Sequence, residues 1–255
     1  MKTNKWMLFL LLLVFCQCTE DKKIEQDYGL TILPGACFPE VKDKYVYPIV
    51  PGMIEWQQLE SIDAAYKLCQ LPDSVLKSIS TPGLIDALIH APLFTGWFLL
   101  SSSGSVVLSW HWLYDQFNSA GELFKRKDVG EALIAYYKLT CFDCIDTPIG
   151  IYGEYERMMG LEILFTRQEI MDKIRHDKKK EAVSILLTKY YQRPEYGNEI
   201  FPIVFLMYSD EYEPIMKFAQ EYSDSFQNLL RGYLYSDLKI PLIISIANNY
   251  INDIK

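Results

Sequence analysis

Two cysteines three positions apart, Cys141 and Cys144, form the tetrapeptide of this chain with the clearest potential for chemistry. A Cys-x-x-Cys pair can be a redox couple when a helix N-terminus stabilises one thiolate, and it can supply half of a zinc site. This pair instead follows the C-terminal end of a helix expected over 129–138, where the helix dipole disfavours a thiolate. No second Cys-x-x-Cys and no close pair of histidines completes a tetrahedral site. We therefore favour a structural disulfide or buried thiols at Cys141 and Cys144, with redox chemistry and metal binding as alternatives.

Ser109, His111 and Asp115 are the residue types of a hydrolytic triad. A triad needs its base within hydrogen-bond reach of the nucleophile, and its members normally come from separated elements. On one helix, residues two positions apart face away from each other. The acids elsewhere lack a neighbouring histidine or a glycine-bearing calcium loop, as at Asp143 with Asp146 and at Glu154 with Glu156. The sequence therefore predicts no catalytic residues, no metal site and no cofactor, and it favours a protein that is not an enzyme.

Aromatic residues are abundant, with 18 Tyr and 5 Trp, and four of them lie in or beside one apolar segment: Trp97, Trp110, Trp112 and Tyr114. Aromatic side chains at helical spacing usually pack in or around a core. Exposed members, however, would stack on a sugar ring or a partner. The segment 94–114 is therefore the basis of an alternative function, glycan binding or glycan hydrolysis. Hydrolysis would also need two carboxylates about 5 to 10 Å apart.

The N-terminus has the features of an export signal. Lys2 and Lys5 precede a short apolar run, 6–15, which is too short to span a bilayer and ends at Cys16-Gln17-Cys18. This arrangement resembles bacterial lipoprotein signals, in which a peptidase cuts before a cysteine that then carries a diacylglycerol. The resemblance implies a signal peptide over 1–17 and lipidation of Cys18, because the apolar residues extend up to it and acidic residues follow. Lipidation of Cys16, an ordinary secreted protein and an uncut anchor are the alternatives.

The charge balance restricts the partners. The formal net charge is −8, and removal of 1–17 makes it −10 because Lys2 and Lys5 are lost. An acidic chain is a poor ligand for nucleic acid, which is bound largely through Lys and Arg. It is also repelled by anionic headgroups, which favours a domain held off the membrane by a tether and not one that lies on the membrane. We expect a cell-envelope location, most simply the outer membrane, with 18–52 as a tether and extended lead-in.

From residue 53 to 255 the apolar spacing is helical, and no strand has strong support. One five-position template places its residues on a single helical stripe, at Val129, Ala132, Leu133, Tyr136 and Tyr137. It recurs at Val183, Leu186, Leu187, Tyr190 and Tyr191, then at Ile243, Ile246, Ala247, Tyr250 and Ile251, with a weaker copy at Leu84, Ala87, Leu88 and Ala91. A helix with such a stripe buries it against its neighbours. We expect an all-α domain, built as an irregular, solenoid-like helical-repeat array or as a bundle.

No Asp, Glu, Lys or Arg occurs between Asp86 and Asp115, which raises the question of a membrane span. Pro92 and the serine-rich run 101–105 divide this stretch into two short apolar pieces. A spanning helix needs about 20 consecutive apolar residues. Two buried elements joined by a turn are therefore the better interpretation.

Three groups of residues between 47 and 139 carry a further resemblance: 48–52 with Trp56, then 69–84 with its Cys-Gln-Leu-Pro start, then 117–128. They are similar to a module of uncharacterised secreted proteins and lipoproteins of Gram-negative bacteria. The resemblance covers a little over a third of the chain. It implies a secreted helical fold and brings no assigned activity and no catalytic residues.

These observations together favour a lipid-anchored helical protein that binds a protein partner without catalysing a reaction. The glycan-handling function at 94–114 is the first alternative. Thiol redox chemistry at Cys141 and Cys144 is a further one, which requires both thiols to be exposed and close together.

Overall fold

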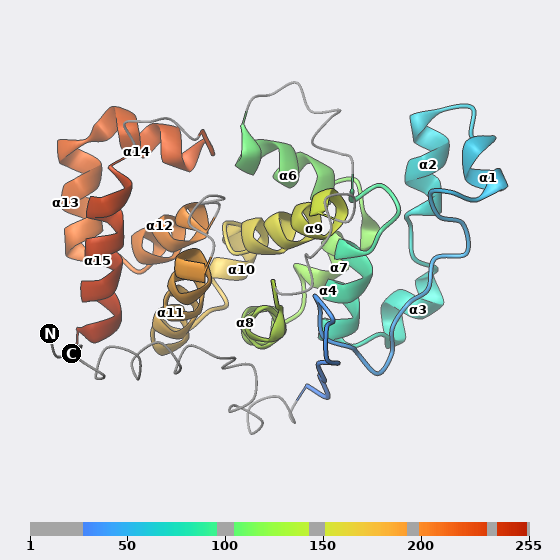
Figure 1. The fold of residues 1–255 in the computed structure, drawn as a ribbon, viewed down its shortest axis with the longest axis horizontal. Helices are drawn as coiled ribbons and strands as arrows, with labels where there is room; N and C mark the ends of the chain where they lie inside the picture. Colours follow the sequence, from blue (N-terminus) through green and yellow to red (C-terminus); the bar gives the residue numbers. More distant parts are fainter. Residues whose placement is uncertain (1–27, 96–104, 143–150, 193–198, 234–238, 254–255) are drawn as a thin grey trace, which may run out of the picture.

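The computed structural model describes residues 28–95, 105–142, 151–192, 199–233 and 239–253, and helices account for most of them from Ile54 onward. No β-strand occurs in these ranges, where the only β-type pairing is an isolated antiparallel bridge between Thr31 and Glu40. The predicted all-α class is therefore confirmed. Figure 1 shows the helices side by side in an elongated arrangement, with α1 to α3 at one end and α13 to α15 at the other.

The helices fall into three groups along the chain. The first group is α1 (Ile54–Gln57), α2 (Ile62–Leu68) and α3 (Asp73–Ser78). The middle of the molecule contains α4 (Thr81–Ile89), α6 (Val106–Tyr114), α7 (Asn118–Leu123), α8 (Val129–Leu139), α9 (Ile151–Leu164) and α10 (Gln168–Met171). The last group is α11 (His176–Gln192), α12 (Ile200–Ser209), α13 (Glu213–Glu221), α14 (Ser223–Leu230) and α15 (Ile240–Asn252).

The helices that carry the repeated apolar template contact one another in chain order. α4 packs on α8, α8 on α11, and α11 on α15. The template positions of α4 and α8 are all buried, and so are those of α11 and α15 except at their C-terminal turns, where Tyr191 is exposed. The four helices with the same apolar spacing therefore pack one on the next, in a row from α4 through α8 and α11 to α15, and their apolar stripes are buried.

α8 starts at Val129 as predicted, but the Asp128 side chain before it does not make the predicted capping hydrogen bond. Its carboxylate instead accepts a hydrogen bond of 2.7 Å from the Thr81 hydroxyl at the start of α4. A tertiary contact between two helices has replaced a local one.

The lead-in before α1 packs against the helices over its described part, 28–52. Leu30, Phe38 and Tyr47 are buried in the same core as the helices. The Tyr47 hydroxyl donates to the carbonyl oxygen of Ala87 in α4 at 3.0 Å. Residues 28–50 are therefore part of the folded domain, which begins well before residue 53.

The uncharged stretch forms buried elements where it is described. All nine residues of α4 are buried, and α6 buries six of its nine. Among the described residues, no helix is both long enough and apolar enough to cross a bilayer. The serine-rich turn expected at 101–105 lies outside them except for Ser105, which caps α6 by accepting from Leu108 N–H.

Candidate functional site

The aromatic segment is divided between the core and the surface. Trp110 and Tyr114 are completely buried and packed with Phe94, as the favoured core interpretation expects, so these two rings cannot stack on a ligand. Their apolar rings fill the space between α6 and α9, and the Tyr114 hydroxyl donates to the Gly160 carbonyl of α9. Trp112 is 47% exposed, and Trp97 lies outside the described residues. Among the described residues of the four, Trp112 alone remains exposed for stacking on a sugar ring.

The cysteines are arranged differently from the favoured interpretation. Cys37 is disulfide-bonded, whereas Cys69 and Cys141 are thiols. Cys144 lies outside the described residues, but a disulfide between Cys141 and Cys144 is excluded because Cys141 is a thiol. The Cys141 N–H donates to the Cys37 carbonyl oxygen at 2.9 Å, which joins the end of α8 to the lead-in. Spacing along the chain could not reveal this approach, because Cys37 is about a hundred residues away.

The spacing in the sequence argues against a hydrolytic triad at Ser109, His111 and Asp115, and in the structure their side chains do not contact one another as a triad would. The Ser109 hydroxyl donates to the Ser105 carbonyl at 2.6 Å. His111 Nε2 lies 2.8 Å from the Thr166 hydroxyl, and Asp115 forms an ion pair of 3.1 Å with Arg167. Each of the three side chains is directed to a different structural partner.

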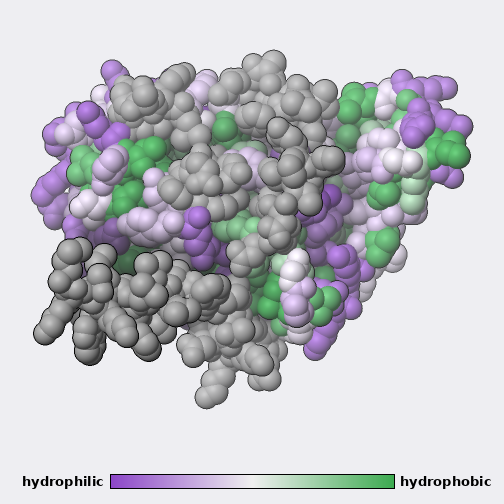
Figure 2. All heavy atoms as spheres, in the orientation of Figure 1, coloured by the Kyte–Doolittle hydropathy of each residue, from purple (hydrophilic) through white to green (hydrophobic). Residues whose placement is uncertain are grey.

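Apolar side chains at the surface of α1, α2 and α6 form a group that we call the docking surface. Its exposed members are Ile54, Ile62, Leu108 and Trp112, and Tyr66 is half-buried between α2 and α6. Ile54 is 69% exposed and Leu108 50%. Tyr66 and Trp112 connect α2 to α6, with their rings edge to face and 6.1 Å between centroids. Figure 2 shows hydrophobic side chains at the surface among hydrophilic ones at the end of the molecule that carries α1 and α2.

Carboxylates predominate around the docking surface near α1 and α2, where the exposed Lys67 in the last turn of α2 is the one cation of these two helices. Glu55, Glu60 and Asp63 are exposed there. No Lys or Arg occurs between residues 45 and 66. The apolar side chains of α1 and α2 are therefore bordered by carboxylates.

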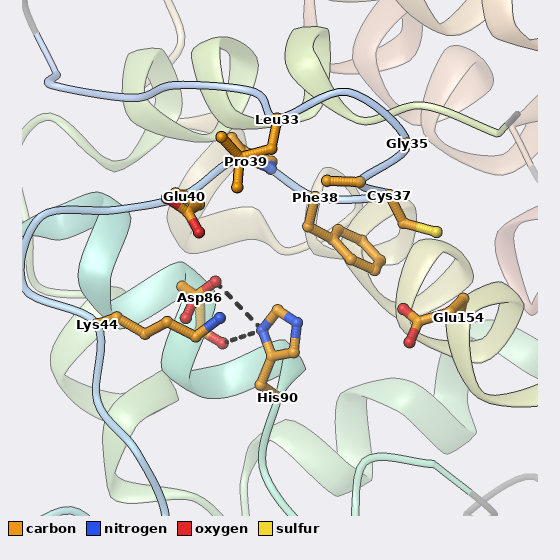
Figure 3. A pocket seen from close by; sticks show the side chains of 11 residues that line it. Leu33, Gly35, Cys37, Phe38, Pro39, Glu40, Lys44, Asp86, His90 and Glu154 are labelled. Atoms are coloured by element: carbon orange, nitrogen blue, oxygen red, sulfur yellow. Dashed lines mark hydrogen bonds and ion pairs between the residues drawn. The ribbon is translucent and has the colours of Figure 1, made fainter. Parts of the chain in front are cut away.

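A second feature is a pocket of about 390 Å³ between the lead-in, α4 and α9. Its polar lining consists of Glu40 and Lys44 from the lead-in, Asp86 and His90 from α4, and Glu154 from α9. Figure 3 shows Asp86 and His90 facing the loop that carries Phe38, with Glu154 opposite and Lys44 extended toward Asp86.

Asp86 and His90 are neighbours one helical turn apart. His90 Nδ1 lies 3.2 Å from Asp86 Oδ1 and 2.9 Å from the Asp86 carbonyl oxygen. The Tyr136 hydroxyl of α8 also donates to Asp86 Oδ1, at 2.9 Å. Burial alone would raise the pKa of the Asp86 carboxyl, but the His90 and Tyr136 hydrogen bonds and the Lys44 charge together lower it. Asp86 is therefore an ionised carboxylate inside the protein.

The pocket presents carboxylates, one imidazole and one ammonium group. No serine, threonine or thiol nucleophile occurs among its lining residues, and the Cys37 sulfur is in a disulfide. Across the described ranges, no group of three or more His, Cys, Asp or Glu side chains is placed to hold a metal ion. Sequence reasoning missed this site. The available signal was a single acid, Asp86, in an otherwise uncharged apolar helix.

Comparisons with known proteins found no matching family model, no matching curated protein and no matching solved structure. The docking surface and the Asp86 pocket are thus the two structural features that bear on the function of this chain.

Proposed function

We propose that this chain is a lipid-anchored cell-envelope protein, most simply of the outer membrane, that binds a protein partner through the docking surface. The observation that supports this proposal most directly is the half-exposed Trp112 in contact with Tyr66, which joins the apolar side chains of α6 to those of α2. Aromatic residues dominate the energetics of protein interfaces, and connected exposed apolar side chains are characteristic of them.

The row of α4, α8, α11 and α15 supports an irregular helical-repeat array as the scaffold for this surface. Stacked helices form rigid, extended faces on which a partner can be bound. The docking surface lies on helices outside this row. The row of α4, α8, α11 and α15 would therefore stabilise the fold, and α1, α2 and α6 would contact the partner protein.

The surface chemistry defines the partner. The docking surface requires an apolar segment opposite it, and the carboxylates of Glu55, Glu60 and Asp63 favour Lys or Arg at the edges of that segment. We therefore infer a partner that presents an amphipathic helix with basic flanks.

Truncating the central aromatic tests this function. With a synthetic amphipathic helix flanked by lysines, we expect calorimetry to show binding that Trp112→Ala weakens by about tenfold or more, the size of an interface hot spot. Glu213→Ala on α13 is the control, because Glu213 is exposed at the other end of the array. Equal binding of a peptide flanked by glutamates, or an unchanged affinity of the Trp112 variant, would contradict the proposal.

The anchor is tested separately. Intact mass spectrometry of membrane-extracted protein is expected to show a mature chain that begins at Cys18 and carries a diacylglycerol. Cys18→Ala should abolish the modification, whereas Cys16→Ala should leave it, because the thiol of the first mature residue is the acylated group. A freely soluble, unmodified mature chain would refute the lipid anchor, and loss of the lipid only in the Cys16 variant would move it to that residue.

A further inference from the structure

The walls of the Asp86 pocket are fixed by ring packing, backbone hydrogen bonds and a disulfide. Phe38 and Pro39 are buried, and the Phe38 ring packs edge to face on His90 with 5.4 Å between centroids. The loop is closed by backbone hydrogen bonds of 2.7 and 3.2 Å between Glu40 and Thr31. Cys37 adds a disulfide to the same loop. The pocket is therefore preformed, which reduces the cost of binding a ligand.

One buried oxygen in this pocket lacks a partner. The Asp86 side chain is 1% exposed, and its Oδ1 accepts from His90 and Tyr136. Its Oδ2 is buried and has no hydrogen-bond partner in the described part of the chain. Leaving a charged oxygen buried and unsatisfied is costly, so this atom favours an occupant that donates a hydrogen bond.

The charged groups that line the pocket favour a ligand with a positive charge. Carboxylates outnumber cations around the pocket, with Asp86, Glu40 and Glu154 against Lys44. Glu154 is held in place by Arg157 of its own helix at 2.7 Å. An anionic ligand would meet three like charges, whereas a cation would gain from them. Phe38 and Leu33 supply an apolar wall for a short carbon body.

We propose that the pocket binds a small organic cation, a primary amine with a short apolar body, whose ammonium group takes the place of the Lys44 ammonium beside Asp86 and donates to Asp86 Oδ2. The site shares no residue with the docking surface, so either proposal can fail without the other. The ligand class follows from an ionised buried acceptor, an acidic rim and an apolar wall.

Benzylamine is the probe, measured by calorimetry on the mature full-length chain, with benzyl alcohol and benzoate as isosteric neutral and anionic comparisons. We expect binding of benzylamine alone. Asp86→Asn should weaken it by about tenfold or more, the loss expected for one charge-assisted hydrogen bond. Lys44→Met should strengthen it severalfold, because the ammonium that extends toward Asp86 competes with the ligand. Glu213→Gln, which removes an exposed acid at the far end of the array, should change nothing.

Absence of benzylamine binding to both the parent and the Lys44→Met protein would overturn the proposal, and so would equal binding of benzyl alcohol. Unchanged affinity in Asp86→Asn would have the same meaning. If Asp86→Asn does not fold, Lys44→Met decides the question, since Lys44 is exposed and its replacement leaves the core intact.

Discussion

Replacing Trp110 with alanine is expected to lower the free energy of unfolding by about 3–5 kcal/mol, as for other buried tryptophans. Trp110 is fully buried, with its ring 4.7 Å from that of Phe94 between centroids. It also packs so closely on α9 that a Cβ placed on Gly160 would lie 2.9 Å from Trp110 Cζ3. Urea denaturation followed by circular dichroism measures this loss against a total stability of typically about 5–15 kcal/mol.

The matched control is Trp112→Ala on the same helix. Trp112 is half-exposed and contacts Tyr66 at the surface, so its removal is expected to cost about 1 kcal/mol or less. A cost for Trp112→Ala equal to or greater than that for Trp110→Ala would show that the assignment of core and surface on α6 is wrong.

Acidification is expected to remove about 3 kcal/mol of stability through His111 alone. Burial and then the Arg167 charge lower the pKa of His111 to about 4, from an ordinary value of 6.5, against an opposing effect of Glu169. Between these two values the unfolded chain binds a proton that the folded protein does not bind. Stability is therefore fully present above pH 6.5 and is lost as the pH falls toward 4.

Burial and the nearby Arg167 charge favour the neutral ring of His111, and the hydrogen bond to Thr166 selects which ring nitrogen carries the proton. The Thr166 hydroxyl donates to the Ile163 carbonyl at 2.7 Å, so its oxygen accepts the Nε2–H of His111. His111→Gln keeps a donor and removes the titration. Urea denaturation across the pH range should give a shallower loss of stability for this variant than for the parent. Identical pH profiles of the two proteins would contradict the assignment.

The sequence was sufficient for the fold class and for much of the core. Helical periodicity identified the stripes of α4, α8, α11 and α15, because a repeat of 3.6 residues leaves one apolar face that must be covered. It also placed the start of α8 at Val129 and gave no triad at Ser109, His111 and Asp115. These features depend on local spacing, which a linear chain displays directly.

The candidate sites were decided by the tertiary structure. Trp110 and Trp112 are two positions apart in an uncharged helix, and only the packing of α9 on one face determines which is buried. The lead-in was expected to stand apart from the helices, but its loop closes the pocket over Asp86 and His90.

What the sequence by itself determined is a set of amphipathic helices with an acidic surface, because local periodicity and composition are properties of the chain. What only the folded molecule decided is which helix covers which face. That choice depends on contacts between residues far apart in sequence, such as Tyr136 with Asp86 and Cys141 with Cys37. These contacts create both the buried carboxylate and the preformed pocket around it.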